Sequence, residues 1–163
     1  MRSISLFLVL ILALQTAPPK VQPMSPLTTG LAHAIKKQEP DWSYAPGVCT
    51  CPELVPHQIS HDVGVWDRKV DGKRQDVLMD VVVAPTAVVA IDWMGKFSRR
   101  EFGSYCEMEK FDLGEDAYLL TCPKPHYYHI QYRKGRAIVE VSSDLKADTE
   151  RFARYAFKLL PDP

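Results

Sequence analysis

Two cysteines and two histidines lie close together in the first half of the chain and could bind a metal ion. Cys49 and Cys51 are followed by His57 and His61, so two thiolates and two imidazoles fall within thirteen residues. Zinc prefers four such ligands in a tetrahedron, and copper also binds them. The His-x-x-x-His spacing would place both rings on one face if this segment were helical. A zinc- or copper-binding protein is therefore one hypothesis for the function.

Disulfide formation competes with metal binding for the same cysteines. The chain has four cysteines, the other two being Cys106 and Cys122. Oxidising compartments hold cysteines as pairs, and the spacing around Cys49 and Cys51 matches no standard zinc pattern. We therefore expect two disulfides and no cofactor, with all three pairings open. Cys106 and Cys122 flank a turn and could lie on neighbouring strands, where a disulfide would stabilise the fold by roughly 3 kcal/mol.

A second candidate site lies on a strand predicted near the C-terminus. Aromatic and β-branched residues alternate with polar ones between positions 126 and 133, the pattern of a half-buried strand. One face of this strand carries Tyr127, His129, Gln131 and Arg133. An aromatic ring, an imidazole and a guanidinium together can bind an anionic or polar partner. The competing interpretation is an ordinary solvated sheet face.

Signatures of known enzyme classes are absent from the sequence. It contains no Gly-x-Ser-x-Gly, no glycine-rich phosphate loop and no His-Glu-x-x-His. Asp112, Glu115 and Asp116 cluster, but within a predicted turn, where acidic residues are common. A hydrolase with dispersed catalytic residues is the third hypothesis.

The elements that must position these residues begin with the last third of the chain. Two strands are predicted over 117–122 and 126–132, and a third over 137–142 after a turn in which Gly135 can adopt positive φ. An amphipathic helix follows, with Asp144 as its expected N-cap. A one-sided sheet beside a one-sided helix buries both apolar surfaces when the two pack together.

Further strands precede this unit. Strands are predicted over 63–70 and 76–84, joined through an Asp71-Gly72 turn, and another over 105–111. Residues 86–102 have both strand and helix features, and we favour a helix capped by Thr86. The order ββ-α-β-βββ-α predicts an α+β domain over 47–163. Its single twisted, mainly antiparallel sheet would carry both helices on one face, as a two-layer sandwich.

The N-terminal part predicts export. Arg2 precedes an apolar block within residues 1–17, which is the core of a signal peptide, with cleavage there or as late as position 34. Residues 18–46 predict a largely irregular linker, although Trp42 and Tyr44 are candidates to dock onto the domain. We expect a periplasmic or extracellular location. Membrane contact would arise only through an uncleaved N-terminal segment.

Composition excludes some classes of partner. Twenty basic and twenty acidic residues leave no formal net charge, which argues against nucleic acid. An apolar fraction of 46% is typical of globular proteins and not of disordered chains. The leading hypothesis is thus a small exported binding or accessory domain, not an enzyme, whose partner is an unknown protein or small ligand. Its binding surface would be the open sheet face that carries the four residues from Tyr127 to Arg133.

Overall fold

The computed structural model describes residues 26–47, 55–101, 105–114, 116–123 and 126–160. These residues form three helices and seven strands in an α+β arrangement. In chain order the elements are α1 (Pro26–Gln38), β1 (Ser43–Gly47), β2 (Ser60–Val70), β3 (Lys73–Val83), α2 (Ala87–Glu101), β4 (Glu107–Lys110), β5 (Ala117–Pro123), β6 (His126–Lys134), β7 (Ala137–Ser143) and α3 (Lys146–Leu159). The residues predicted to form the signal peptide lie outside the described part. None of the helices described is long and apolar enough to cross a membrane.

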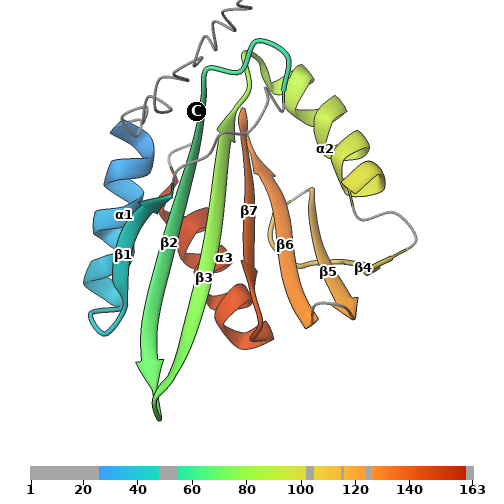
Figure 1. The fold of residues 1–163 in the computed structure, drawn as a ribbon. Helices are drawn as coiled ribbons and strands as arrows, with labels where there is room; N and C mark the ends of the chain where they lie inside the picture. Colours follow the sequence, from blue (N-terminus) through green and yellow to red (C-terminus); the bar gives the residue numbers. More distant parts are fainter. Residues whose placement is uncertain (1–25, 48–54, 102–104, 115, 124–125, 161–163) are drawn as a thin grey trace, which may run out of the picture.

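All seven strands belong to one sheet, in the order β1-β2-β3-β7-β6-β5-β4 (Figure 1). Every neighbouring pair is antiparallel, which confirms the predicted sheet type. The β2–β3 hairpin turns at Asp71 and Gly72, which have φ of 51° and 77°. Positive φ at both central residues matches the right-handed twist of the strands, so this turn confirms the Asp-Gly prediction.

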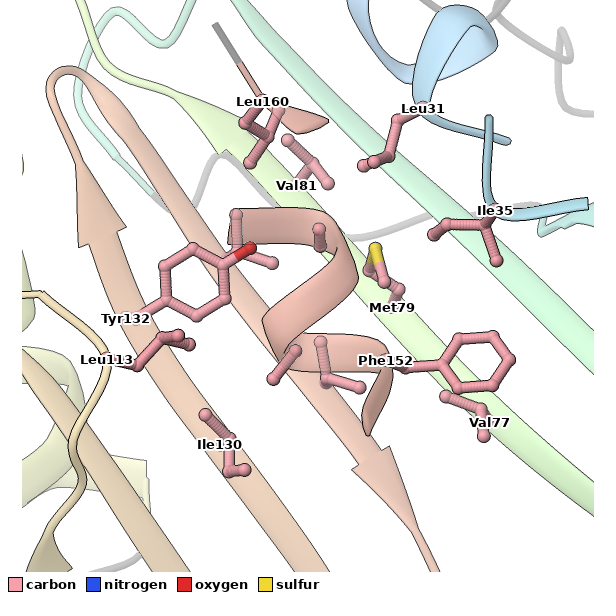
Figure 2. Close-up of a cluster of buried hydrophobic side chains, with 14 of the residues drawn as sticks. Leu31, Ile35, Val77, Met79, Val81, Leu113, Ile130, Tyr132, Phe152 and Leu160 are labelled. Atoms are coloured by element: carbon pink, nitrogen blue, oxygen red, sulfur yellow. The ribbon is translucent and has the colours of Figure 1, made fainter. Parts of the chain in front are cut away.

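One face of the sheet packs against α1 and α3, and we call it the inner face. Alternate residues of β3, Val77, Met79 and Val81, point into this core and are at most 1% exposed. Phe152 of α3 and Ile130 of β6 are fully buried beside them (Figure 2). The alternation of β3 and the helical spacing of α3 each make one apolar surface, and packing them together removes both from water.

The opposite face, which we call the outer face, is partly covered by α2, so the prediction of two helices on one face is wrong. Val82 and Ile138 point away from the inner core and pack against Ala90 and Met94 of α2. The described domain therefore has three layers rather than two. The sequence signal was the continuous run ending β3: when consecutive strand residues are all apolar, both faces of the strand are buried.

The prediction of an irregular linker over 18–46 is wrong for the described part of that range. Leu31 and Ile35 recur at helical spacing on α1 and are buried against the inner core. Trp42 is 0% exposed and its ring lies 5.0 Å from that of Phe152, which confirms that it docks. Tyr44 docks as well, with its ring 4.9 Å from Trp66. The prediction relied on a composition rich in Pro, Thr and Lys and therefore missed a short amphipathic helix.

The helices α2 and α3 differ in how their first turns are capped. Thr86 Oγ1 accepts a hydrogen bond from Val89 N at 3.2 Å, which confirms both α2 and its predicted cap. Asp144 does not cap α3. The N-cap position is Leu145, whose N–H donates to Ser143 Oγ at 3.2 Å. This bond lies just before the helix, and the N-cap residue of α3 makes no side-chain capping bond.

Candidate functional site

The structure places all four residues of the predicted binding face on the outer face of β6. Tyr128, Ile130 and Tyr132 point the other way, toward α3. The face is not open as expected, however. Gln131 is 0% exposed, and the side chains of His129 and Arg133 are only 16% and 13% exposed. Whether these residues bind a partner stays a prediction.

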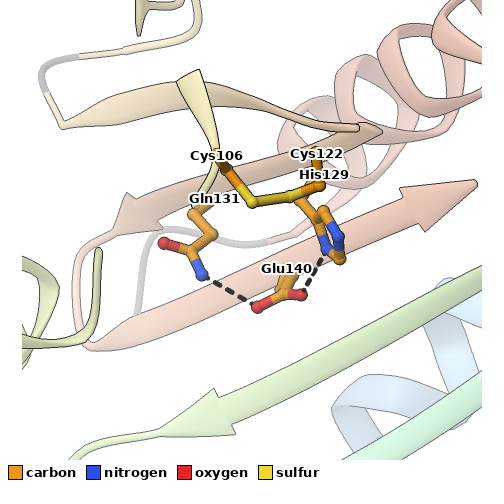
Figure 3. The surroundings of a disulfide bond; sticks show 5 residues. All are labelled: Cys106, Cys122, His129, Gln131 and Glu140. Carbon is orange, nitrogen blue, oxygen red and sulfur yellow. Dashed lines mark hydrogen bonds and ion pairs between the residues drawn. A yellow bond between two sulfur atoms is a disulfide. The ribbon is translucent and has the colours of Figure 1, made fainter. Parts of the chain in front are cut away.

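A hydrogen-bonded network explains why polar side chains are tolerated there. His129 Nδ1 lies 2.9 Å from Glu140 Oε1, and Gln131 Nε2 donates to Glu140 Oε2 at 2.9 Å (Figure 3). Glu140 lies directly opposite Gln131 on β7. Each of its two carboxylate oxygens has one partner in this network, His129 or Gln131. Buried polar groups are costly only when unpaired. Sequence reasoning missed Glu140, although its outward position in the apolar strand 137–142 was the available signal.

A second histidine–carboxylate pair continues the same row. Asp80 of β3 lies opposite Glu140, and its Oδ1 is 3.1 Å from His61 Nε2 on β2. The side chain of His61 is 6% exposed and that of Asp80 is 26% exposed. Each imidazole is therefore held by a carboxylate, an arrangement that fixes the orientation of the ring.

The network does not include an activated nucleophile in the described part of the chain. Ser142 is the residue opposite His129 on β7, which gives a serine, a histidine and a glutamate on one face. Catalysis of the serine-hydrolase type needs a hydrogen bond between the serine hydroxyl and the imidazole. No such bond is present, and Ser142 is only 4% exposed. The described residues of this face therefore do not form the hydrogen-bonded serine–histidine pair of that class.

Arg133 has a structural role. Its Nε donates to Asp116 Oδ2 at 2.7 Å, a second guanidinium nitrogen lies 2.7 Å from the same oxygen, and Nη1 donates to the carbonyl of Gly135 at 3.2 Å. These bonds tie the end of β6 to the start of β5 and to the β6–β7 turn. Sequence reasoning assigned Asp116 only to a turn. Its partner lies 17 residues away, which local patterns do not reveal.

The accessible part of the outer face lies at the other end of these strands, beyond α2. We define the outer-face patch as Asp76, Leu78, Asp80, Tyr127 and His129, all of them partly exposed. The rings of Tyr127 and His129 are 6.0 Å apart. Burial and the nearby charges of Asp76 and Asp144 raise the pKa of Tyr127, so its hydroxyl remains a neutral donor. The patch combines carboxylates with two rings.

The Cys106–Cys122 disulfide stands beside this network. The two Cα atoms are 4.3 Å apart, and Figure 3 shows the bridge close to His129 and Gln131. This pairing was one of the three that the sequence left open, and it excludes those that join these cysteines to the N-terminal pair. Cys49 and Cys51 lie outside the described residues. Cys106 directly precedes β4, the short strand at the edge of the sheet, and Cys122 lies in β5, so the bridge links these two strands.

The metal hypothesis stays a prediction, but the helical geometry it invoked does not occur. The chain turns at Pro56 and His57, where His57 has a φ of 58°, and enters β2 at Ser60. His57 is exposed, whereas the ring of His61 bonds Asp80. Among the described residues, no three His, Cys, Asp or Glu side chains lie close enough to hold a metal ion.

A cavity of about 460 Å³ lies between α1 and the edge strand β1. Its described lining consists of Thr29, Ala32, His33, Lys36, Ser43 and Tyr44. Sequence reasoning missed this cavity because it treated the segment as a linker. The only signal was the spacing of four of these residues along one face of a helix.

Fold and surface together define a three-layer α+β domain in which a seven-stranded antiparallel sheet presents a partly covered polar face. Comparison of the chain with protein-family models, with curated proteins and with solved structures finds no match.

Proposed function

We propose that the protein is a small exported binding domain, not an enzyme, that acts in the cell envelope or outside the cell. It binds a polar protein or small ligand through the outer-face patch. The observation that carries this proposal is the support behind His129. Glu140, a neighbour on the same face, holds the ring, and Gln131 in turn holds Glu140. A contact residue whose side chain is held by such neighbours, on strands rather than loops, is pre-organised for binding.

Export is supported by the Cys106–Cys122 disulfide. Such bonds form and persist in oxidising compartments and are rare in the reducing cytosol. The apolar N-terminal block of the sequence is consistent with the same route.

The charge of the patch refines the kind of partner. The guanidinium of Arg133, which suggested an anionic partner, is neutralised by Asp116. The patch itself carries the carboxylates of Asp76 and Asp80, and Asp144 is near enough to affect Tyr127. Complementary charge steers association and suppresses wrong partners. A neutral or positively charged polar partner therefore fits this surface better than an anion.

The test places a photo-crosslinking phenylalanine derivative at Tyr127 in the producing cell. The matched control carries it at Tyr155 of α3. Tyr127 and Tyr155 each hydrogen-bond a carboxylate, that of Asp76 and that of Glu39 respectively. We expect one dominant adduct at Tyr127 and none at Tyr155. Tyr127→Ala should weaken binding of the adducted partner by about tenfold, the effect of roughly 1.4 kcal/mol. The thermal midpoint should change no more than it does in Tyr155→Ala.

Equal crosslinking from both positions, or none from Tyr127, would show that the outer-face patch is not a binding surface. A fall in thermal midpoint with Tyr127→Ala that accounts for the whole loss of binding would show that this side chain is structural.

A further inference from the structure

The cavity between α1 and β1 is separate from the outer-face patch. α1 packs on the inner side of the sheet, against α3, and β1 is the edge strand farthest from β6 in the sheet order. Four of the six lining residues come from one face of α1, and the other two come from the start of β1. A volume of about 460 Å³ lies within the range of small-molecule sites.

Lys36 provides a fixed positive charge at the cavity wall. Its ammonium donates to the backbone carbonyls of Pro40 (2.7 Å) and Trp42 (2.5 Å), which hold it in place. An ammonium group has three donors, so one is left for a ligand. No carboxylate in the described part of the chain pairs with Lys36. The nearby Glu39 is occupied by Arg151, 3.2 Å away.

The remaining walls combine an aromatic surface with polar groups. Tyr44 is half-buried and its ring is held against Trp66, so the cavity has a rigid aromatic surface beside Ala32. Burial and the charge of Asp62 raise the pKa of Tyr44, which keeps the hydroxyl protonated. No acidic side chain is among the described lining residues, and His33 adds ring nitrogens. The polar groups thus converge on one uncompensated cation beside an apolar surface.

We propose that this cavity binds a small organic anion, with its carboxylate on Lys36 and its apolar body against Tyr44. A charge-assisted hydrogen bond to a pre-positioned ammonium fixes the orientation of the ligand. The site does not depend on the outer-face patch, and either proposal can fail without the other.

The test titrates benzoate and its neutral analogue benzamide into the isotopically labelled protein and follows the backbone amides by NMR. We expect benzoate to shift the amides of α1 and β1, and benzamide to bind about tenfold more weakly, the loss expected for one charge-assisted hydrogen bond. Lys36→Met should weaken benzoate binding to a similar extent. Lys158→Met, at an exposed lysine of α3, is the matched control and should bind benzoate as the wild type does.

Because Lys36 also holds the turn after α1, a second variant keeps that lysine. Ser43→Trp places a large ring in the cavity from an exposed position at the start of β1 and should abolish the shifts. The proposal is overturned if benzoate leaves the amides of α1 and β1 unshifted, or if benzamide binds equally well. Unchanged benzoate binding to Ser43→Trp would also overturn it, since the ligand would then lie elsewhere.

Discussion

The four residues of the predicted binding face differ in what they can do, because their neighbours differ. Arg133 and Gln131 direct donors to Asp116 and Glu140, and both are largely or fully buried. Tyr127 lies in the partly exposed patch beside His129. Removing a buried partner leaves the other group unpaired, which costs about 1–3 kcal/mol. Alanine at Arg133 therefore tests the fold, whereas alanine at Tyr127 tests recognition.

At the same scale, Tyr132→Phe is expected to preserve or raise stability. The Tyr132 hydroxyl is fully buried and has no hydrogen-bond partner among the described residues, so removing it at pH 7 relieves a cost of about 1 kcal/mol. Tyr128→Phe, which breaks the 2.9 Å bond to His126, should be neutral or slightly destabilising. Urea unfolding measures both. A loss of more than about 1 kcal/mol of unfolding free energy in Tyr132→Phe would contradict the conclusion that the Tyr132 hydroxyl has no hydrogen-bond partner among the described residues.

The same residue predicts an alkaline limit of stability. Burial raises the pKa of Tyr132 well above its ordinary value of 10. Above pH 10 the tyrosine of the unfolded chain loses its proton, whereas the folded chain keeps it. The contribution of Tyr132 to the unfolding free energy is therefore fully present below about pH 10 and is lost as the pH rises further. Tyr132→Phe should therefore make the fall in unfolding free energy above pH 10 shallower.

Among the elements, the β2–β3 hairpin shows how local chemistry decides local structure. Alternating residues and an Asp-Gly pair predicted both strands and their turn, and the observed register runs from Ser60 opposite Val83 to Val70 opposite Lys73. Figure 1 shows this hairpin extending beyond the other strands, where few tertiary contacts can override its own preferences. Element boundaries were less predictable, because strand ends depend on their partners: β2 begins at Ser60, three residues before the predicted start.

A matched pair of glycine substitutions tests the turn of the β2–β3 hairpin and the helix α1. Gly72 has a φ of 77° with nothing within 4 Å of an added Cβ, so Gly72→Ala should destabilise by about 1 kcal/mol through backbone strain alone. Gly30 lies inside α1, also with open space, and Gly30→Ala should stabilise by about 0.5–1 kcal/mol. Denaturant unfolding measures both. Effects of the same sign would contradict the assigned turn or the assigned helix.

For the whole molecule, the main finding is that the segment expected to be a linker completes the core. Trp42 of the turn between α1 and β1, Trp66 of β2 and Phe152 of α3 meet in one aromatic cluster. Arg68 lies over the Trp42 ring, 4.5 Å from its centroid. A domain that began at residue 47 would leave these apolar rings without their covering layer.

Trp42→Ala tests this at the scale of the molecule. Truncating a fully buried tryptophan leaves a cavity in the core, so we expect a loss of about 3–5 kcal/mol in unfolding free energy. Asp41→Ala, at the exposed neighbouring residue, should change stability by less than about 0.5 kcal/mol. Similar effects for the two variants in urea unfolding would mean that the segment is only a linker.

The sequence by itself determined the strands from Ser60 onward, the Asp71-Gly72 turn, the C-terminal helix and the sharing of one face by Tyr127 to Arg133, and it favoured a helix over 86–102. These follow from periodicity and turn chemistry, which act between residues close in the chain. Only the tertiary structure decided that α2 covers the outer face, that α1 and β1 join the core, and that Glu140 holds His129. Such choices depend on contacts between segments far apart in the chain: a period assigns a residue to a face but carries no information on what will cover that face.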